Sequence, residues 1–134
     1  MILLSELVDD INALLAIDNI QDYCPNGLQV EGANKVATMV TGVTASQALI
    51  DPAVAINADA LLVHHGYFWK NEAPQIVGIK KQRIARLLEN NISLLAYHLP
   101  LDLHAELGNN VQLAKVLGWQ PDALVNLDEL PPLI

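Results

Sequence analysis

Residues 58–66 read Ala-Asp-Ala-Leu-Leu-Val-His-His-Gly, a nearly unbroken apolar run that ends in two adjacent histidines. A second apolar run, from Ile92 to Tyr97, also ends in polar chemistry, with His98 next and Asp102 shortly after it. Fully apolar runs of this length are typical of the buried strands of a parallel sheet. Ligands of open α/β sheets bind outside the carboxyl ends of the strands. The pattern therefore predicts that imidazoles and a carboxylate from two strand ends meet at one place, and a metal is the simplest reason.

The segments around these runs alternate between strand and helix patterns. Strands are predicted over residues 35–44, 58–64 and 92–97, with a short edge strand at 28–30. Helices are predicted from Ser5, as the capping residue, to about residue 17, and over residues 46–57, 76–90 and 109–117. Pro52 either kinks the second helix or opens a shorter one. This order predicts an α/β fold, a three-layer sandwich whose mostly parallel sheet is flanked by helices.

Composition narrows the class of protein. The 134 residues suit one domain with a core of its own. Seven basic against fifteen acidic residues give a net charge of −8, so a nucleic-acid partner is not expected. Hydrophobic residues make up 52% of the chain, but no run reaches the roughly 18 consecutive apolar residues of a membrane helix. We expect the surplus apolar surface to face another subunit or a missing part of the chain. The start of the chain does not resemble a signal peptide and Cys24 is the one cysteine, so we expect a cytoplasmic protein.

The histidine pair suggests a specific kind of metal site. In a regular strand His64 and His65 would face opposite sides of the sheet, but at a strand end, where Gly66 lets the backbone turn, both can reach one cavity. One histidine for each ion of a pair, with Asp102 bridging, gives a centre in which metals roughly 3.5–4 Å apart activate a shared water. Zinc, iron, manganese, nickel and cobalt all suit such donors. The alternative is that His64 is a hydrogen-bonded core residue and His65 a surface residue.

Two further histidines lie close to Asp102 in the sequence. His98 either orients a neighbouring group or carries a proton, because imidazole titrates near neutral pH. His104 and Glu106 are expected to be an exposed loop pair. Catalytic metals usually keep about three protein ligands each, so His64, His65 and Asp102 alone would leave a two-ion centre incomplete.

Half of the six aromatic residues stand together beside Lys70, as Tyr67, Phe68 and Trp69. Tyr67, Trp69 and Lys70 are candidate substrate contacts, since rings can stack on a planar base while a lysine meets phosphate. A subunit contact or a lid explains the aromatic group equally well. Cys24 has no activating partner in the sequence, and we assign it no nucleophilic role.

Four motifs along the chain resemble the NIF3-like family, also called GTP cyclohydrolase I type 2 homologues, and especially its bacterial YbgI-type members. They are Pro25–Val30, Val40–Ser46, Ala58–Lys70 and Tyr97–Asp102. The resemblance implies an α/β protein with two divalent ions in a dinuclear centre, assembled as a toroidal homohexamer. It also implies that His64 and His65 each bind one ion, that Asp102 binds both, and that His98 lies in the motif that lines the site.

The family takes a further histidine and a glutamate from a second, related half near its carboxyl terminus, and this sequence lacks that half. We therefore expect residues 1–120 to be the metal-binding first half of the family's fold and residues 121–134 a truncated linker toward a missing second half. The resemblance implies a hydrolase-like protein acting on a small molecule, with ring opening of GTP as the family's named activity and His98 moving protons. A non-catalytic metal-binding protein or ring-forming scaffold remains the alternative.

Overall fold

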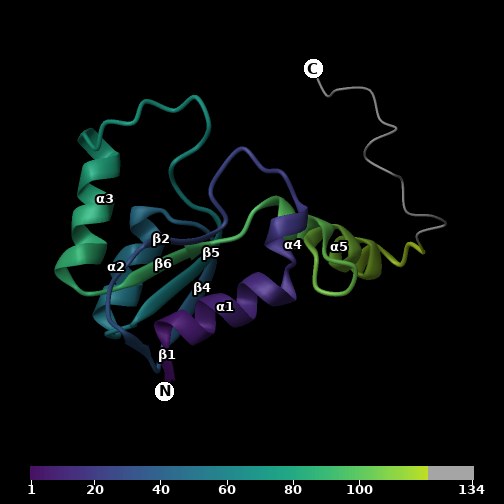
Figure 1. The fold of residues 1–134 in the computed structure, drawn as a ribbon, viewed down its shortest axis with the longest axis horizontal. Coiled ribbons are helices and arrows are strands. Elements are labelled where there is room, and N and C mark those ends of the chain that lie inside the picture. The colour runs from purple at the N-terminus through teal and green to yellow at the C-terminus, as the bar shows by residue number, and fades with distance from the viewer. Residues whose placement is uncertain (121–134) are drawn as a thin grey trace.

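The apolar run that ends in the histidine pair forms β5 (Ala60–His65), an inner strand of a four-stranded sheet. The computed structural model describes residues 1–120 (Figure 1). In it β5 pairs in parallel with β4 (Met39–Thr44) and with β6 (Ser93–Ala96). The short β2 (Gly27–Val30) closes the other edge by pairing antiparallel with β6, so the strand order is β2-β6-β5-β4. The mostly parallel sheet and the edge strand expected near residues 28–30 are confirmed.

The other elements are two short strands and a set of helices around this sheet. In chain order they are β1 (Ile2–Leu3), α1 (Leu4–Leu14), the 3-10 turn η1 (Ile17–Asn19), β3 (Lys35–Val36), α2 (Gln47–Ala55), α3 (Gly78–Glu89), α4 (Leu99–Leu103) and α5 (Asn109–Leu117). β1 and β3 pair antiparallel as a separate two-stranded ribbon.

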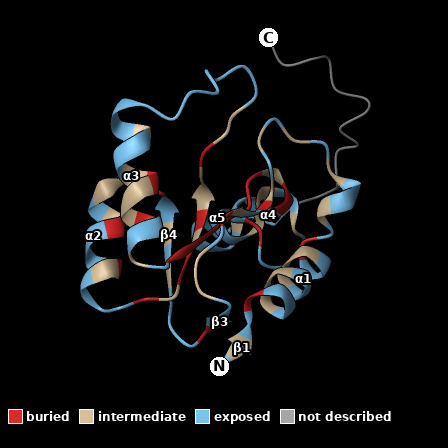
Figure 2. Ribbon diagram, turned by 60° about the vertical axis from the view of Figure 1, so that its left-hand side comes forward, coloured by how far each residue is buried: buried red, intermediate tan, exposed pale blue. Residues whose placement is uncertain are grey.

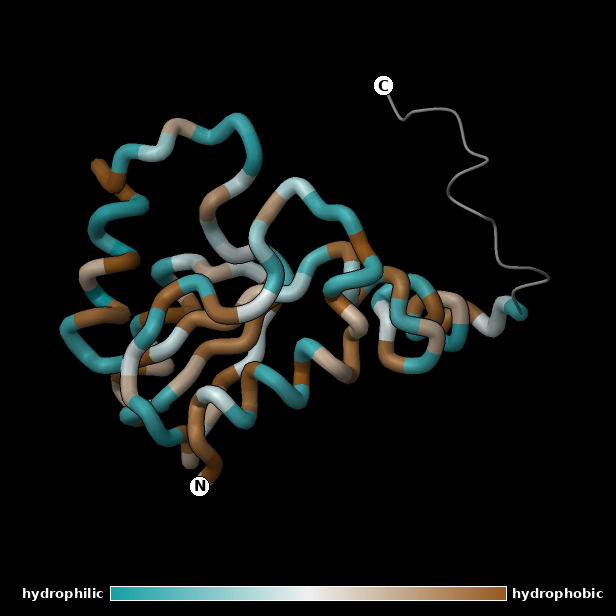
Figure 3. The backbone as a smooth tube through the Cα atoms, viewed as in Figure 1, coloured by the Kyte–Doolittle hydropathy of each residue, from teal (hydrophilic) through white to brown (hydrophobic). Residues whose placement is uncertain are grey.

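Alternating side chains of the central strands build two cores, one on each face of the sheet. On one face Leu61 and Val63 pack with Ile50 of α2 and Leu87 of α3. On the other face the buried and half-buried residues of α1 pack against the sheet together with Ala60, Leu62, Leu95 and Tyr97. The helices therefore form two outer layers, with α2 and α3 on one side and α1 on the other (Figure 1). The two inner strands, β5 and β6, are the apolar, largely buried centre of the molecule, whereas the residues of the edge strand β4 are exposed or half-buried (Figures 2 and 3).

The single strand predicted over residues 35–44 is wrong, because the structure divides it into β3 and β4. The break falls at Ala37 and Thr38, whose backbone N–H groups both donate to Oδ2 of Asp59, at 2.8 Å each. A carboxylate from the start of the next strand thus takes up two donors that a continuous strand would offer to its neighbour.

The start of α1 differs from the sequence pattern, whereas the start of α2 agrees with it. α1 begins at Leu4, so Ser5 lies inside the helix and is not its cap; Glu6 instead accepts a hydrogen bond from the N–H of Leu3 at 3.2 Å. α2 follows Ser46 and accommodates Pro52 within its length. α4 was not expected from the sequence. It has Pro100 in its first turn, where proline is tolerated because the N–H groups there have no partner within the helix.

None of the helices in residues 1–120 combines the length and the apolar character needed to cross a membrane. The linker expected at residues 121–134 lies outside the described residues.

Candidate metal centre

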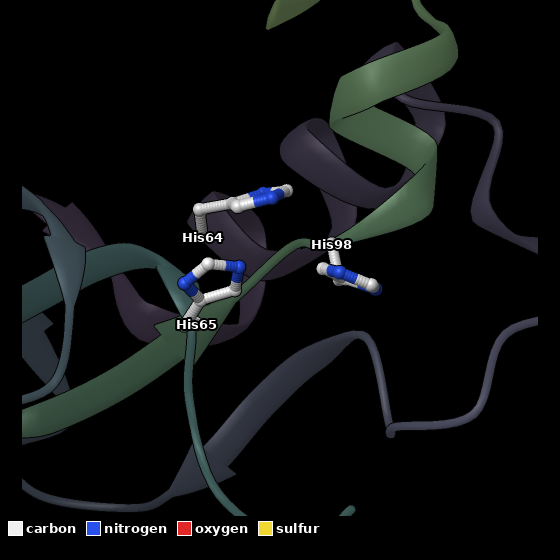
Figure 4. Close-up of side chains that lie close together, drawn as sticks. All are labelled: His64, His65 and His98. Atoms are coloured by element: carbon white, nitrogen blue, oxygen red, sulfur yellow. The ribbon is translucent and has the colours of Figure 1, made fainter.

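Parallel pairing of β5 and β6 brings three histidines to one edge of the sheet. The register pairs Val63 with Ala96, so the chain leaves β5 at His64 and His65 beside the point where it leaves β6 toward His98. One ring nitrogen from each of the three histidines lies within 4.8 Å of the others. The ring centroids of His64 and His65 are 4.5 Å apart and those of His64 and His98 are 4.8 Å apart (Figure 4). The meeting of imidazoles expected from the sequence is therefore present in the fold.

Position 66, directly after the two histidines, leaves no room for a side chain, because other groups approach its Cα closely. A Cβ at this position would overlap Oε1 of Gln29 and lie 2.7 Å from the Cβ of Ala96. Gln29 is itself held, since its Oε1 accepts from the N–H of Tyr67 at 2.7 Å and its Nε2 donates to the carbonyl of Pro25 at 2.8 Å. The glycine thus lets the chain leave β5 tight against β2 and β6, which keeps both histidines at the strand end.

The proton of His64 can be assigned from its neighbours. Its Nδ1 lies 3.0 Å from the carbonyl oxygen of Tyr97, and because a carbonyl only accepts, Nδ1 carries the hydrogen. Its Nε2 faces Oδ1 of Asp102 at 3.6 Å. In a neutral His64 a lone pair on Nε2 therefore faces a carboxylate oxygen, and a cation at Nε2, either a proton or a metal ion, makes this contact favourable.

Asp102 reaches the cluster from α4, the short helix that follows β6. Its Oδ1 also accepts a hydrogen bond from Nδ2 of Asn109, at the start of α5, at 2.8 Å. This hydrogen bond orients the carboxylate of Asp102. Asn109 was not singled out in the sequence. Asp102 therefore lies close to His64 on the same rim, while the donor atoms within 4.8 Å of one another are those of His64, His65 and His98.

His65 sits in an environment that favours its neutral form. Burial lowers its pKa, the nearby His64 and His98 lower it further, and the Asp102 carboxylate opposes the shift. Its Nδ1 lies 3.3 Å from Oγ1 of Thr44 on the neighbouring strand. A neutral imidazole is the form that binds a metal, so this environment suits a ligand.

The third histidine, His98, is buried and is held by the loop before β2. The backbone N–H of His98 donates to Oδ1 of Asn26 at 2.7 Å, and its ring Nδ1 lies 3.1 Å from Oδ1 of Asp22. Burial of Asp22 opposes ionisation, but hydrogen bonds from Asn26, His98, Leu99 and Tyr23 outweigh it and lower the pKa of this carboxyl. Asp22 was not expected from the sequence, because its contact with His98 spans 76 positions.

Aromatic rings form one wall around His98. Trp69 meets the His98 ring edge-on at a centroid distance of 5.0 Å, and Tyr23 does so at 5.2 Å. Tyr23, which the sequence analysis also missed, is 52% exposed. The structure does not bring Tyr67 to this wall: its side chain is in the core and its hydroxyl donates to the carbonyl of Ala45 at 2.7 Å.

The remaining polar residues singled out in the sequence lie at the margin of the cluster or in loops. Lys70 is exposed and its backbone N–H donates to the carbonyl of Tyr23 at 2.6 Å. His104 uses Nδ1 to accept from the N–H groups of Glu106 and Leu107, at 3.2 and 3.1 Å. This local turn agrees with the loop role expected for His104 and Glu106.

Asp22, Cys24 and His98 form a second group of donor atoms within 4.8 Å of one another. Burial raises the pKa of the Cys24 thiol to about 12, and the charge of Asp22 and a hydrogen bond to it act in the same direction. The metal-free thiol is therefore protonated at neutral pH, and a metal ion there would have to displace this proton. Of the two groups in residues 1–120, the three-histidine group with Asp102 beside it has the donor chemistry that fits divalent transition metals.

A hollow of about 450 Å³ opens beside His64 on the α1 face of the sheet. Its walls are mostly apolar and include Ile11, Leu62, Tyr97 and Leu101. This volume is within the range of small-molecule sites.

Comparison with known proteins places this geometry in a family. The model of Duf34/NIF3 (NGG1p interacting factor 3) matches residues 2–128. A Pseudomonas aeruginosa protein named GTP cyclohydrolase 1 type 2 homolog is 63% identical over 119 residues, which are 89% of this chain and 47% of that protein. An Escherichia coli K12 protein of the same name is 55% identical over 130 residues, 97% of this chain and 51% of its own length. The chain spans about half the length of the curated relatives it matches.

Solved structures agree with this assignment. A structural-genomics structure of protein ybgI, described as of unknown function, superposes with a TM-score of 0.86 at 58% identity, over 87% of this chain and 47% of that one. The protein TTHA1606 from Thermus thermophilus superposes with a TM-score of 0.81 at 44% identity, over 87% and 48% of the two chains. The sequence motifs, the sheet and the relatives agree, and the chain belongs to the Duf34/NIF3 family.

Proposed function

We propose that this chain is part of a metal-dependent, hydrolase-like protein, in which His64, His65 and Asp102 hold a pair of divalent ions. The observation that carries the proposal is the pairing of His64 with Asp102. The Nδ1–H of His64 is committed to the carbonyl of Tyr97, while Nε2 faces the carboxylate at 3.6 Å. A metal ion between imidazole and carboxylate would satisfy both groups, and the neutral His65 supplies a second nitrogen at the same rim.

Each residue has a distinct task under this proposal. Divalent ions in such a site acidify a water molecule and polarise a substrate oxygen. His64 and His65 would each bind one ion and Asp102 would bind both. His98 is buried beside them and would accept a proton from the attacking water and return it to the leaving atom of the substrate.

These three ligands are too few for two catalytic ions, which usually have about three protein ligands each. We propose that the others come from outside residues 1–134, because the chain spans about half the length of its curated relatives. The resemblance in the sequence suggests a histidine and a glutamate. We also propose a cytoplasmic homohexameric ring as the assembled form, since the apolar side chains exposed on and just after α5 need partners.

The substrate is proposed to be a small molecule bound where the hollow beside His64 and the Tyr23–Trp69 wall meet the histidines. Trp69 could contact a flat ring, and the exposed Lys70 could contact an anionic group. The name carried by the relatives makes GTP the first compound to assay. With a net charge of −8, the chain offers little attraction to nucleic acid.

The proposal is tested by turnover in the protein as expressed from its gene, loaded in turn with zinc, manganese, iron, nickel or cobalt. We expect hydrolysis of a nucleotide or cyclic amide that stops on chelation and returns with metal. His98→Gln should lower the rate roughly 10²–10⁴-fold, as loss of a general acid–base does, with its metal content unchanged. His104→Gln is the matched control and should retain activity. Turnover that persists after complete metal removal would contradict the proposal.

A non-catalytic ring-forming scaffold is the second candidate, and the surface of α5 suits an assembly under either candidate. Large apolar side chains are exposed on and just after this helix: Leu113, Val116, Leu117 and Trp119. Contiguous exposed apolar residues mark contact surfaces. Two results together would favour this candidate: the protein assembles into rings, and it binds and exchanges metal without turning over any of a broad panel of substrates.

A further inference from the structure

The side chain of Asp22 is the centre of a dense hydrogen-bond network beneath His98. It is 2% exposed, and both of its oxygens are engaged. Oδ1 accepts from the N–H of Tyr23 at 2.7 Å and contacts Nδ1 of His98 at 3.1 Å. Oδ2 accepts from Nδ2 of Asn26 at 3.0 Å and from the N–H of Leu99 at 2.9 Å. A carboxylate buried this deeply is removed from water, so its charge must be stabilised by the groups that it contacts.

These contacts determine which way the hydrogen bond to His98 points. The backbone N–H groups of Tyr23 and Leu99 can only donate. Asn26 also donates to Asp22, through Nδ2, because its Oδ1 accepts from the backbone N–H of His98. Both oxygens of Asp22 are therefore acceptors, and Nδ1 of His98 must be the donor. A neutral His98 then has its lone pair on Nε2.

We propose that Asp22 is a positioning residue that holds His98 in the Nδ1–H tautomer and so keeps Nε2 unprotonated for the histidine cluster. The use of that nitrogen, to move a proton or to bind an ion, rests on the function proposed above. The tautomer itself does not. His64 is held in the same way, because the carbonyl of Tyr97 accepts from its Nδ1. Carboxylates and carbonyls that take the second ring N–H are a common means of orienting the histidines of metal sites.

The same network restricts what Asp22 could do in the second donor group. Its contacts with Tyr23, Asn26, His98 and Leu99 engage both oxygens. A metal placed there would have to displace the bonds that anchor the loop to Leu99.

Asp22→Asn tests the idea because an amide cannot accept on both sides. If its oxygen faces His98, its NH₂ opposes the donors of Asn26 and Leu99. If the oxygen faces those two donors, the NH₂ opposes Tyr23 N–H and points at Nδ1 of His98, which can adapt by moving its proton to Nε2. The second placement leaves fewer unsatisfied donors, so we expect His98 to change tautomer.

The measurement is ¹⁵N chemical shifts of the ring nitrogens in the metal-free 134-residue chain, at a pH well above the titration range of imidazole. The chain has four histidines, and the spectrum of His98→Gln identifies the signals of His98. The wild type should show a protonated Nδ1, and Asp22→Asn should shift the population toward protonated Nε2. Asp18→Asn is the matched control, because Asp18 is exposed and the substitution removes the same charge.

A wild-type His98 protonated on Nε2 would overturn the proposal. So would a folded Asp22→Asn variant whose tautomer is unchanged. If the variant does not fold, the wild-type spectrum alone decides the question.

Metal binding provides the second readout and separates this inference from the proposed function. Under the proposed function His98 moves a proton and is not a ligand, so Asp22→Asn should leave the number of bound ions unchanged, as should Asp18→Asn, while it lowers turnover. A variant that loses an ion from its stoichiometry would identify Asp22 as a ligand and overturn the positioning role. A wild type that binds no metal but has the Nδ1–H tautomer would refute the proposed function and leave this inference standing.

Discussion

Replacing Gly66 by alanine should be among the most damaging single-methyl additions in this chain. The new Cβ would overlap Oε1 of Gln29 and lie 2.7 Å from the Cβ of Ala96, which has no rotamer with which to move away. If Gln29 swings out, the protein loses its bonds to Tyr67 and Pro25, at about 0.5–1.5 kcal/mol each. Overpacking against Ala96 adds about 1–3 kcal/mol. The expected loss of unfolding free energy is therefore about 2–6 kcal/mol.

Urea denaturation of four proteins measures this: the wild type, Gly66→Ala, Gln29→Ala and the double variant. Part of the cost of Gly66→Ala comes from displacing Gln29, so the double variant should be more stable than the sum of the single effects predicts. The expected coupling is about 0.5–3 kcal/mol, as for residues in contact. Two results would refute the packing argument. One is a free energy of unfolding of Gly66→Ala within about 0.5 kcal/mol of the wild type, which is the usual effect of a surface substitution. The other is strict additivity of the two changes.

Three further predictions concern the fold around the site. Asp59 has a lowered pKa because the N–H groups of Thr38 and Ala37 donate to it, so its stabilising effect is present above the usual aspartate pKa and is lost as pH falls through the lowered value. Asp59→Asn should therefore flatten the acid limb of a plot of stability against pH, and an unchanged limb would contradict this. Burial raises the pKa of the Cys24 thiol to about 12, so alkylation at neutral pH should be slow in the native protein and fast in urea; equal rates would show that the thiol is not protected. Ile50→Ala should cost about 2–5 kcal/mol by leaving a cavity in the core between α2 and the sheet, whereas the same change at an exposed residue such as Ile56 should cost far less in calorimetry.

The inner strands β5 and β6 were predictable because burial on both faces makes them apolar along most of their length. The run at residues 92–97 became β6, and the run before the histidines became β5. Their parallel pairing then brought His64, His65 and His98 together without further information. The prediction failed where a side chain distant in sequence intervened, as when Asp59 separated β3 from β4.

The inner support of the site was less visible in the sequence. Asp22 and Asn26 lie in a segment whose proline, asparagine and glycine are explained by turn formation alone. Their role depends on hydrogen bonds to His98 and Leu99, more than 70 positions away, which no local pattern records. Likewise, α4 is only five residues long and Pro100 is its second residue, a pattern that indicates a loop as readily as a helix.

Counting metal ions in purified protein tests the central claim most directly. Elemental analysis of the wild type, His64→Ala and His104→Ala should find divalent metal bound to the wild type, a reduced metal content in His64→Ala, and the wild-type content in His104→Ala. Equal metal content in all three folded proteins, or no bound metal in the wild type after loading, would contradict the account.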